Sequence, residues 1–323
     1  MKAAVYTEYG GPDVVRIKEI APPEPGAGEV LIKVSHSTVT TADWRLRAAA
    51  FPGVLAVPGR LMFGLTRPRN PVLGSEFAGT VAALGAGVSA FAVGDAVFGF
   101  APSGAHAEFL THREDGAVLP LPDGVGAGEA VAVPFGGLSA LVFLRDFANL
   151  QAGQNVLVVG ASGGVGGYAV QVARLLGAEV TGVASGARED MVRALGATGF
   201  VDYMTQDIAA LHERFDVVFD TIGTMDFARA RTLLKPKGVF VPLNFGLREV
   251  WQAFWSCFRG GQRVKIGVNE DRKPDLAVLR DWMAQGRLRA VVGARYALAD
   301  IRDAHALVQG RHKQGAVVID IAA

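Results

Sequence analysis

The chain of 323 residues is 50% hydrophobic and 20% charged with a formal net charge of +1, which is typical of a globular enzyme of two domains and excludes a disordered chain. The near-zero charge argues against nucleic-acid and membrane-surface partners, and the single cysteine, Cys257, excludes an intrachain disulfide and a thiolate zinc cluster. Because we find neither a signal-peptide-like run nor an apolar stretch long enough to cross a bilayer, we expect a cytoplasmic protein.

Short strand-like runs alternate with glycine- and proline-containing turns over residues 1 to about 120. This alternation predicts an antiparallel barrel or sandwich-like domain. The expected strands lie at 3–9, 14–20, 29–39, 77–85, 95–100 and 105–112.

Beyond about residue 121, helical periods alternate with apolar strands. Apolar strands separated by helices predict a parallel sheet that is covered on both faces. The pattern changes again near Lys273, where two amphipathic helices and a closing strand follow. The expected strands are 155–160, 179–185, 199–203, 215–223, 238–246 and 315–321, and the two helices are 274–288 and 300–310.

A glycine-rich turn, GASGGVGG at residues 160–167, lies between an expected strand and an expected helix that ends near Gly177. Glycines allow a tight turn and a close approach to a pyrophosphate, and the start of the following helix attracts its negative charge. We therefore expect a dinucleotide site. The residues expected to meet the pyrophosphate are Ser162, Gly163, Gly164 and Val165.

The same turn also satisfies the G-x-S-x-G pattern of a hydrolase nucleophile elbow, in which Ser162 would be the nucleophile. No oxyanion-type HGGG stretch precedes it, and an elbow does not explain Gly166 and Gly167. A serine hydrolase is therefore the weaker alternative, and a purely structural turn is a second one.

The loop after the second strand of this unit lacks the acid that holds an NAD ribose about 20 residues after the glycines. It reads ASGAR and offers Ser185 and Arg188. A guanidinium neutralises a 2′-phosphate and a hydroxyl can hydrogen-bond to it, so this loop predicts NADPH rather than NADH. The alternative is that Arg188 is only a surface charge at the start of a helix.

These motifs, in this order, resemble the medium-chain dehydrogenase/reductase superfamily, most closely its zinc-independent quinone oxidoreductase branch. The resemblance runs through PVLGSEFAGTVAALGAGVSAFAVGDAVFGF, GASGGVGGYAVQVARLLGAEV, LGATGFVDY, FDVVFDTIG and HALVQGRHKQGAVVIDI. It implies an α/β chain with a GroES-like, partly open β-barrel catalytic domain and a Rossmann domain with a doubly wound parallel sheet. The barrel would be formed by 1–122 and 272–323 and the NADPH-binding Rossmann domain by 123–271, with the active site in the cleft between them and a homo-oligomer, most simply a dimer.

The resemblance also bears on zinc. Zinc-dependent members place a cysteine in the stretch that reads SHSTVTTAD here and a histidine before the glutamate of GSEFAG, where this chain has Thr40 or a neighbour and Ser75. Only Glu76 is retained, and one carboxylate is not a zinc site. We therefore expect no metal, and we expect Glu76 and Asp43 to be buried polar residues that orient loops.

The resemblance and the ends of the parallel strands suggest further cofactor contacts. Ser139 would lie near the nicotinamide, Tyr203 near the 2′-phosphate and Arg311 near the cofactor. The strand-end loops would contribute Ile222, Asn244 and Phe245.

On the substrate side, Thr40 and Thr41 stand where relatives usually carry Asn-Pro, and Thr40 could hydrogen-bond to the substrate carbonyl. Trp44, Phe51 and Phe63 could form an apolar wall, although core packing explains each equally well. The segment 250–258 places four aromatic side chains on one helical face, which predicts core or subunit packing or, alternatively, a lid.

Without zinc to stabilise an alkoxide, an electron-poor acceptor suits the site best. We therefore expect an NADPH-dependent enzyme that passes hydride to a small, hydrophobic quinone or α,β-unsaturated carbonyl. Two alternatives remain. One is an NADPH-binding sensor or structural protein with little turnover, and the other is an alcohol or aldehyde dehydrogenase-reductase of the same superfamily.

Overall fold

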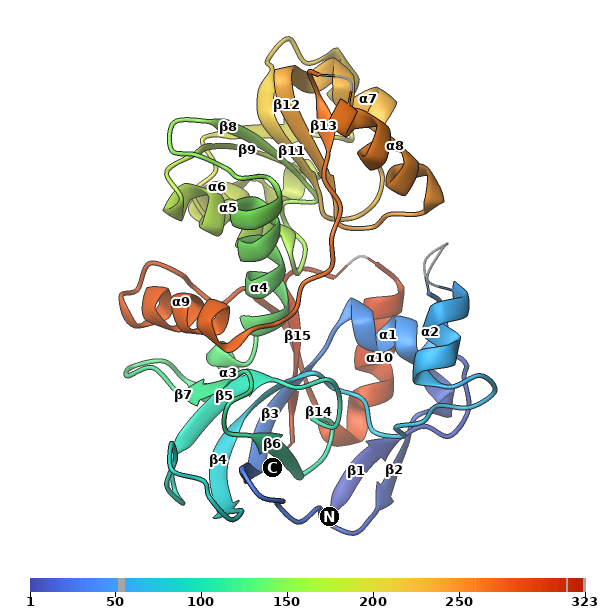
Figure 1. The fold of residues 1–323 in the computed structure, drawn as a ribbon, viewed down its shortest axis with the longest axis vertical. Helices are drawn as coiled ribbons and strands as arrows, with labels where there is room; N and C mark the ends of the chain where they lie inside the picture. The colour runs from blue at the N-terminus through green and yellow to red at the C-terminus, as the bar shows by residue number, and fades with distance from the viewer. Residues whose placement is uncertain (52–55, 259, 312, 322–323) are drawn as a thin grey trace. The chain divides into compact units, whose positions relative to one another are not determined.

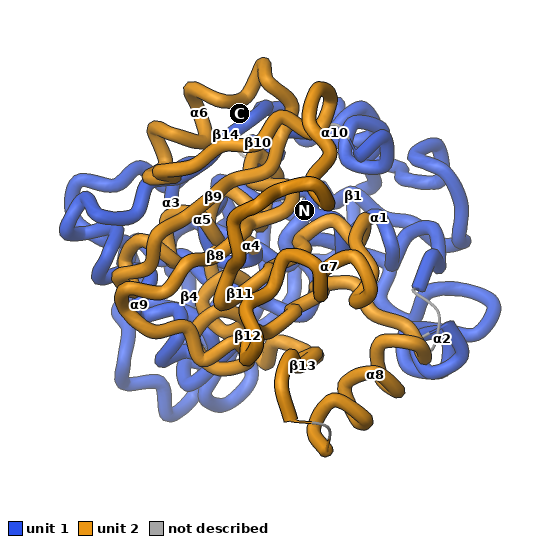
Figure 2. The backbone as a smooth tube through the Cα atoms, turned by 90° about the horizontal axis from the view of Figure 1, so that it is seen from above, with its two compact units in different colours: residues 1–51, 55–135, 271–323 blue, residues 52–54, 136–270 orange. Residues whose placement is uncertain are grey.

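The computed structural model describes residues 1–51, 56–258, 260–311 and 313–321. These residues form two compact units, which Figure 2 distinguishes by colour. The first contains the described residues of 1–135 and 271–323, and the second contains Gly136–Glu270. The domain boundaries expected from the sequence stay a prediction. No helix in the described ranges is long and apolar enough to cross a bilayer.

The first unit is built on a seven-stranded, mostly antiparallel sheet (Figure 1). Its C-terminal strand pairs with a strand near the N-terminus, with Val317 opposite Val39, so the end of the chain completes this unit. The strand order is β14 (Val292–Ala297), β15 (Ala316–Asp320), β3 (Glu29–Val39), β4 (Glu76–Leu84), β5 (Ala96–Phe100) and β7 (Val118–Pro120), and β6 (Phe109–Arg113) pairs with β3.

Alternating side chains of β3, among them Val30, Ile32 and Val34, are buried in the core of this unit. The alternation is the period-two pattern of a strand with one buried face. A separate two-stranded sheet pairs β1 (Lys2–Val5) with β2 (Arg16–Glu19). The helices of the unit are α1 (Thr41–Ala48), α2 (Ala56–Phe63), α3 (Ala127–Ala130), α9 (Lys273–Ala284) and α10 (Ile301–Gln309).

The second unit is a six-stranded parallel sheet whose strand order reverses beside β8 (Figure 1). The first strand, β8, lies between β9 and β11, so the chain leaves the sheet centre in both directions. This is the doubly wound arrangement, in which ligands bind at the carboxyl ends of the strands near the switch point. The order is β10 (Gly199–Asp202), β9 (Glu179–Ala184), β8 (Asn155–Val159), β11 (Phe215–Asp220), β12 (Leu234–Pro242) and β13 (Arg263–Val264).

The central strands of this sheet are buried on both faces, as their continuous apolar runs predict. Leu157, Val218 and Phe240 belong to one core cluster. The helices are α4 (Pro134–Val142), most of which lies in this unit, α5 (Gly166–Leu175), α6 (Glu189–Ala194), α7 (Phe227–Leu233) and α8 (Leu247–Phe258).

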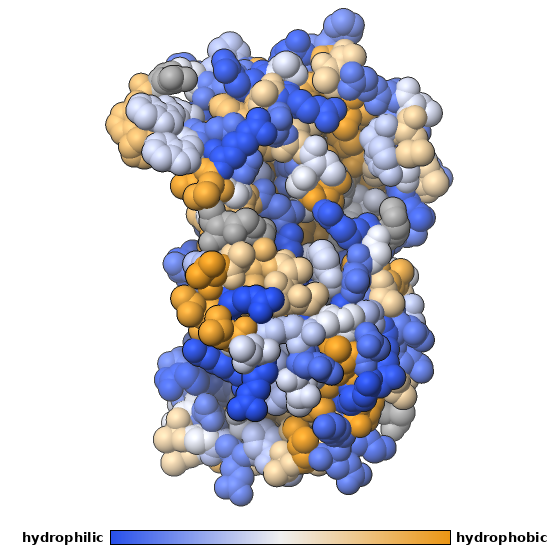
Figure 3. All heavy atoms as spheres, turned by 90° about the vertical axis from the view of Figure 1, so that its right-hand side faces the viewer, coloured by the Kyte–Doolittle hydropathy of each residue, from blue (hydrophilic) through white to orange (hydrophobic). Residues whose placement is uncertain are grey.

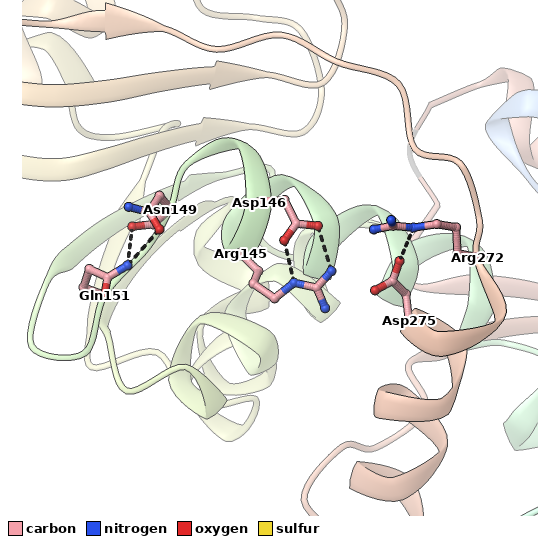
Figure 4. A network of polar contacts seen from close by, with 6 residues as sticks. All are labelled: Arg145, Asp146, Asn149, Gln151, Arg272 and Asp275. Atoms are coloured by element: carbon pink, nitrogen blue, oxygen red, sulfur yellow. Dashed lines mark hydrogen bonds and ion pairs between the residues drawn. The ribbon is translucent and has the colours of Figure 1, made fainter.

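Local side-chain pairs support the ends of several elements (Figure 4). In the second unit, Arg145 and Asp146 form a two-bond ion pair in the π-helical turn Phe143–Phe147, with N–O distances of 2.6 and 2.7 Å. In the first unit, Arg272 donates to Asp275 at 3.1 Å where α9 begins. Pairs this close in sequence brace turns and helix starts and carry little of the folding energy.

The expected fold class, an α/β chain with a GroES-like barrel and a Rossmann-type sheet, is confirmed. Several short elements were not expected, namely α1, α2, α3, α4, β7, β13 and β14. Two of them have little local signal, because α2 contains Pro58 and Gly59 and β13 has only two residues.

Candidate functional site

The glycine turn after β8 has a backbone that only glycine fits. Gly160 has φ +82°, and a Cβ added at Gly166 would lie 1.9 Å from the Gly160 carbonyl oxygen. The Gly163 amide donates to the same oxygen at 2.9 Å. The turn is therefore tight, and α5 starts directly against it. At such a helix start the first N–H groups have no partner within the helix and favour an anion.

The residues predicted to meet the pyrophosphate lie in this turn. Ser162, Gly163 and Gly164 are partly exposed, whereas Val165 is buried and precedes α5 as its N-cap. The helix α4 approaches from another side, because a Cβ at Gly136 would lie 2.1 Å from the Gly164 carbonyl oxygen. The donor set and the close backbone fit a dinucleotide phosphate.

The loop predicted to hold the 2′-phosphate follows β9. The Arg188 amide donates to the Ser185 carbonyl at 2.8 Å, which forms the short 3-10 turn Gly186–Arg188. The Tyr203 amide donates to the Ala184 carbonyl at 3.2 Å, so the loops after β9 and β10 are neighbours. The structure thus brings Ser185, Arg188 and Tyr203 to one edge of the sheet. No described residue forms a side-chain hydrogen bond or ion pair with Arg188.

Sequence reasoning missed an acid at this edge. A Cβ added at Gly186 would lie 2.7 Å from Oδ2 of Asp202, so the Asp202 carboxylate contacts the loop that carries Arg188. Its Oδ1 accepts a hydrogen bond from the Met204 amide at 2.9 Å. The acid comes from the neighbouring strand β10, and only the parallel pairing of Asp202 with Ala184 places it there.

The loop after β11 is shaped by a buried carboxylate. Asp220 accepts hydrogen bonds from the amides of Ile222, Gly223 and Met225 at 3.0, 2.9 and 2.7 Å. Burial raises the pKa of Asp220, and these hydrogen bonds act in the opposite direction. The shape of this loop is therefore set by one side chain that accepts from several amides.

This loop contacts the glycine turn. A Cβ at Gly160 would lie 2.6 Å from Cγ2 of Ile222, and a Cβ at Gly223 would lie 3.0 Å from Nδ2 of Asn244. Ile222 and Asn244 are therefore brought to the same carboxyl edge as the glycine turn, and Phe245 follows Asn244. Ser139 is buried on α4, in the same unit.

A second polar cluster lies in the first unit around Glu76. This side chain is 1% exposed; its Oε1 accepts from the Phe135 amide at 2.7 Å, and its Oε2 accepts from the Thr38 hydroxyl. Burial raises the pKa of Glu76 to about 7, while the bonds from Thr38 and Phe135 and the charge of Lys313 act in the opposite direction. Glu76 can therefore hold a proton near neutral pH.

Asp43 and Thr40 form a neighbouring group. Asp43 accepts from the Gly74 amide at 2.9 Å and from the Thr40 amide and hydroxyl at 2.7 and 2.6 Å. Thr40 is the N-cap of α1, and its hydroxyl also accepts from the Asp43 amide. Glu76 and Asp43 thus orient loops as expected. Thr40 has a capping role here, and its contact with a substrate stays a prediction.

Among the described residues, no group of three or more histidine, cysteine, aspartate or glutamate side chains could hold a metal ion. His106, a buried histidine, contacts the Thr38 carbonyl through Nε2 at 2.8 Å and packs edge-on against His305 at 5.8 Å between ring centroids. Both histidines thus pack inside the first unit. Independence from zinc stays a prediction.

The three aromatic residues expected on the substrate side have different packing partners. Trp44 packs against the barrel core, whereas Phe51 and Phe63 stack on each other with ring centroids 5.8 Å apart. Arg311 lies after α10 in the first unit, with φ +60° and an exposed side chain. The roles predicted for these four residues stay predictions.

The aromatic face of 250–258 lies on α8 and is exposed. Trp251, Phe254, Trp255 and Phe258 are 59%, 53%, 50% and 72% exposed, respectively. The prediction that this face packs into the core of the chain is therefore wrong. The opposite face of α8, with the buried Ser256, packs inward. Ser256 accepts from the Val264 amide of β13 at 3.1 Å.

A β-rich GroES-like unit joined to a Rossmann-type unit with a glycine turn defines a class of dehydrogenases and reductases. Residues 26–146 match the alcohol dehydrogenase GroES-like domain, and residues 195–319 match the zinc-binding dehydrogenase family. The chain belongs to the medium-chain dehydrogenase/reductase superfamily, in its quinone oxidoreductase-like branch, and it is an oxidoreductase. The serine-hydrolase interpretation of Ser162 is therefore wrong.

Individual relatives are similar to this chain over nearly its full length. The chain is 29% identical to a quinone oxidoreductase of Pseudomonas aeruginosa, over 98% of this chain and 99% of that protein. The solved quinone oxidoreductase of Coxiella burnetii has a TM-score of 0.87 at 25% identity and covers 100% of this chain and 99% of its own. The CurK enoyl reductase has a TM-score of 0.86 at 25% identity, with 99% of both chains covered.

Proposed function

We propose that this chain uses NADPH to reduce a quinone or an α,β-unsaturated carbonyl and needs no zinc. The observation that carries the cofactor choice is the Arg188 guanidinium. Arg188 belongs to the loop that follows β9, as Ser185 does, and its side chain has no hydrogen-bond or ion-pair partner among the described residues. Arginine is well suited to a phosphate because its fork of donors pairs with phosphate oxygens.

The chain's own residues would hold the cofactor in three parts. Ser162, Gly163, Gly164 and Val165 would bind the pyrophosphate at the start of α5. Ser185, Arg188 and Tyr203 would bind the 2′-phosphate. The remaining contacts would come from Ser139, Ile222, Asn244, Phe245 and Arg311. When bound, NADPH supplies the hydride.

The acceptor class is supported by the names of the relatives, which include quinone oxidoreductases and an enoyl reductase. Electron-poor acceptors of this kind need orientation, polarisation and a proton rather than a strong Lewis acid. Ser75, and Thr40 or a neighbour of it, stand where zinc-dependent members carry metal ligands, and neither serine nor threonine is a usual zinc ligand.

Glu76 is the proton-holding group that we propose for the first unit. Its pKa of about 7 suits a group that gains and loses a proton at neutral pH. The Thr38 hydroxyl donates to it and holds its orientation. Thr40 remains the proposed hydrogen-bond donor to the substrate carbonyl, and to donate there its hydroxyl would have to release its hydrogen bond to Asp43.

The proposal is tested by NADPH absorbance against a panel of quinones, enones and aldehydes, with NADH in parallel and with and without chelator. We expect chelator-insensitive NADPH consumption with a quinone or an enone, and at least tenfold preference over NADH. NADPH binding without turnover of any acceptor would instead favour the sensor, and aldehydes alone as acceptors would favour the dehydrogenase-reductase alternative. Analytical ultracentrifugation tests the proposed dimer.

Asp202 supports one competing cofactor choice. Its carboxylate lies against the loop that carries Arg188 and would repel a 2′-phosphate, whereas it could accept a hydrogen bond from an NADH ribose. If NADH proves equal to or better than NADPH, Asp202 rather than Arg188 determines the choice of cofactor.

A further inference from the structure

A hollow of about 510 Å³ lies between α7 and α8 of the second unit. Its lining includes Phe227 and Arg231 from α7, Trp251 and Trp255 from α8, and Gln252 and Gln262. None of these residues belongs to the glycine turn or to the strand-end loops proposed for NADPH. The volume is within the range of small-molecule sites. Figure 3 shows hydrophobic side chains at the surface of the face on which Figure 1 shows α8.

Among the described residues that line the hollow, Arg231 is the charged one, and its charge is positive. The Nε of Arg231 donates to Oε1 of Gln262 at 3.2 Å, and its guanidinium lies 5.8 Å from the centre of the Phe227 ring. Gln262 is itself held, because its Nε2 donates to the carbonyls of Arg231 and Leu234 at 2.9 Å each. No described residue accepts from the two Nη groups of Arg231. The guanidinium is thus positioned and keeps its carboxylate-binding edge available.

A second polar side chain that lines the hollow, Gln252, has an atom without a partner. Its Oε1 is buried and has no hydrogen-bond partner among the described residues. A buried acceptor without a donor costs free energy, so rotation of the Gln252 side chain that brings Oε1 to a donor on a bound ligand would be favourable. Trp251 and Trp255 add flat apolar surface beside it.

We propose that this hollow is a binding site for a planar aromatic carboxylate that also carries a hydroxyl or N–H group. The carboxylate pairs with the Nη groups of Arg231. The ring lies against the tryptophans, and the Gln252 side chain rotates so that its Oε1, which is covered in this structure, accepts from the hydroxyl or N–H. The proposal does not depend on the reaction proposed above.

The probe is 6-hydroxy-2-naphthoate, measured by calorimetry and by the indole N–H resonances of the protein in the presence of saturating NADPH. Trp251→Phe and Trp255→Phe assign two of the four tryptophan signals. We expect those two signals to shift, while the signals of Trp44 and Trp282 stay in place. Loss of binding when NADPH is present would overturn a separate site, as would shifts confined to Trp44 or Trp282.

Arg231→Gln should raise the Kd at least tenfold, which corresponds to about 1.4 kcal/mol. Arg229→Gln removes an exposed arginine of the same helix that does not line the hollow, and it should change the Kd less than twofold. Gln252→Leu should abolish the preference for 6-hydroxy-2-naphthoate over 2-naphthoate. Unfolding curves that match the wild type establish that the variants are folded. Equal Kd values for Arg231→Gln and the wild type would refute the proposal, as would indole signals that move with protein concentration instead of ligand.

Discussion

Replacement of Glu76 by glutamine tests the energetic consequence of a buried carboxyl. Burial raises the pKa of Glu76 from 4.5 to about 7 in the folded protein. The folded state therefore binds this proton more tightly than the unfolded state, and the free energy of unfolding falls as the pH rises from 4.5 to about 7. At about 1.36 kcal/mol per pKa unit, ionisation of Glu76 costs about 3 kcal/mol above pH 7.

Glu76→Gln removes that cost and keeps an acceptor for the Phe135 amide, while its NH2 group can donate to the Thr38 hydroxyl. We expect the variant to be more stable than the wild type at pH 8, by up to about 3 kcal/mol, and the advantage to shrink as the pH falls toward 4.5. The pKa of about 7 already includes the attraction between Glu76 and Lys313, so the expected gain of about 3 kcal/mol allows for its loss in the variant.

The assay is urea unfolding of both proteins at several pH values between 5 and 8, evaluated as the difference between variant and wild type, so that other titrating groups cancel. Glu24→Gln, which removes an exposed carboxylate, is the matched control and should show a small, pH-independent difference. A Glu76→Gln variant that is less stable at pH 8, or a difference that does not change with pH, would refute the reasoning.

Three further predictions concern the loops proposed for the 2′-phosphate, the glycine turn and a buried histidine. Arg188→Gln should lower kcat/KM with NADPH at least tenfold, or about 1.4 kcal/mol, and leave kcat/KM with NADH nearly unchanged. Asp202→Asn should increase the preference for NADPH over NADH. Steady-state kinetics with both cofactors checks this, and an unchanged ratio of the two kcat/KM values in both variants would contradict the proposed 2′-phosphate site. Gly166→Ala should abolish cofactor binding in calorimetry, because its Cβ would lie 1.9 Å from the Gly160 carbonyl oxygen. Gly126→Ala, whose Cβ would lie 4.0 Å from Oε2 of Glu129, should bind the cofactor normally. Burial, with the nearby charges of His106 and Arg47, lowers the pKa of His305 well below 6.5, so this side chain stays neutral in the folded protein. The free energy of unfolding should therefore fall as the pH drops below 6.5. His305→Phe should flatten that decline in acid unfolding curves, and an unchanged decline would count against the prediction.

Sequence patterns determine the local parts of this protein. The apolar strand 155–160, the glycine turn and the following helix were expected within one or two residues of β8 and α5. Side-chain period and glycine geometry act over a few residues, and the chain records them directly. The same holds for Ser185 and Arg188, whose position follows from the end of β9.

Tertiary structure decides which distant groups meet. Glu76 meets Thr38, 38 residues earlier, and the Phe135 amide, 59 residues later, and Asp202 reaches the loop of Arg188 only through the pairing of β10 with β9. The exposure of the aromatic face of α8 is likewise invisible to a periodic pattern, which identifies a face but not what covers it. The pKa of Glu76 and the open edge of Arg231 depend on burial and partners, and both are set by packing between segments that are far apart in the chain.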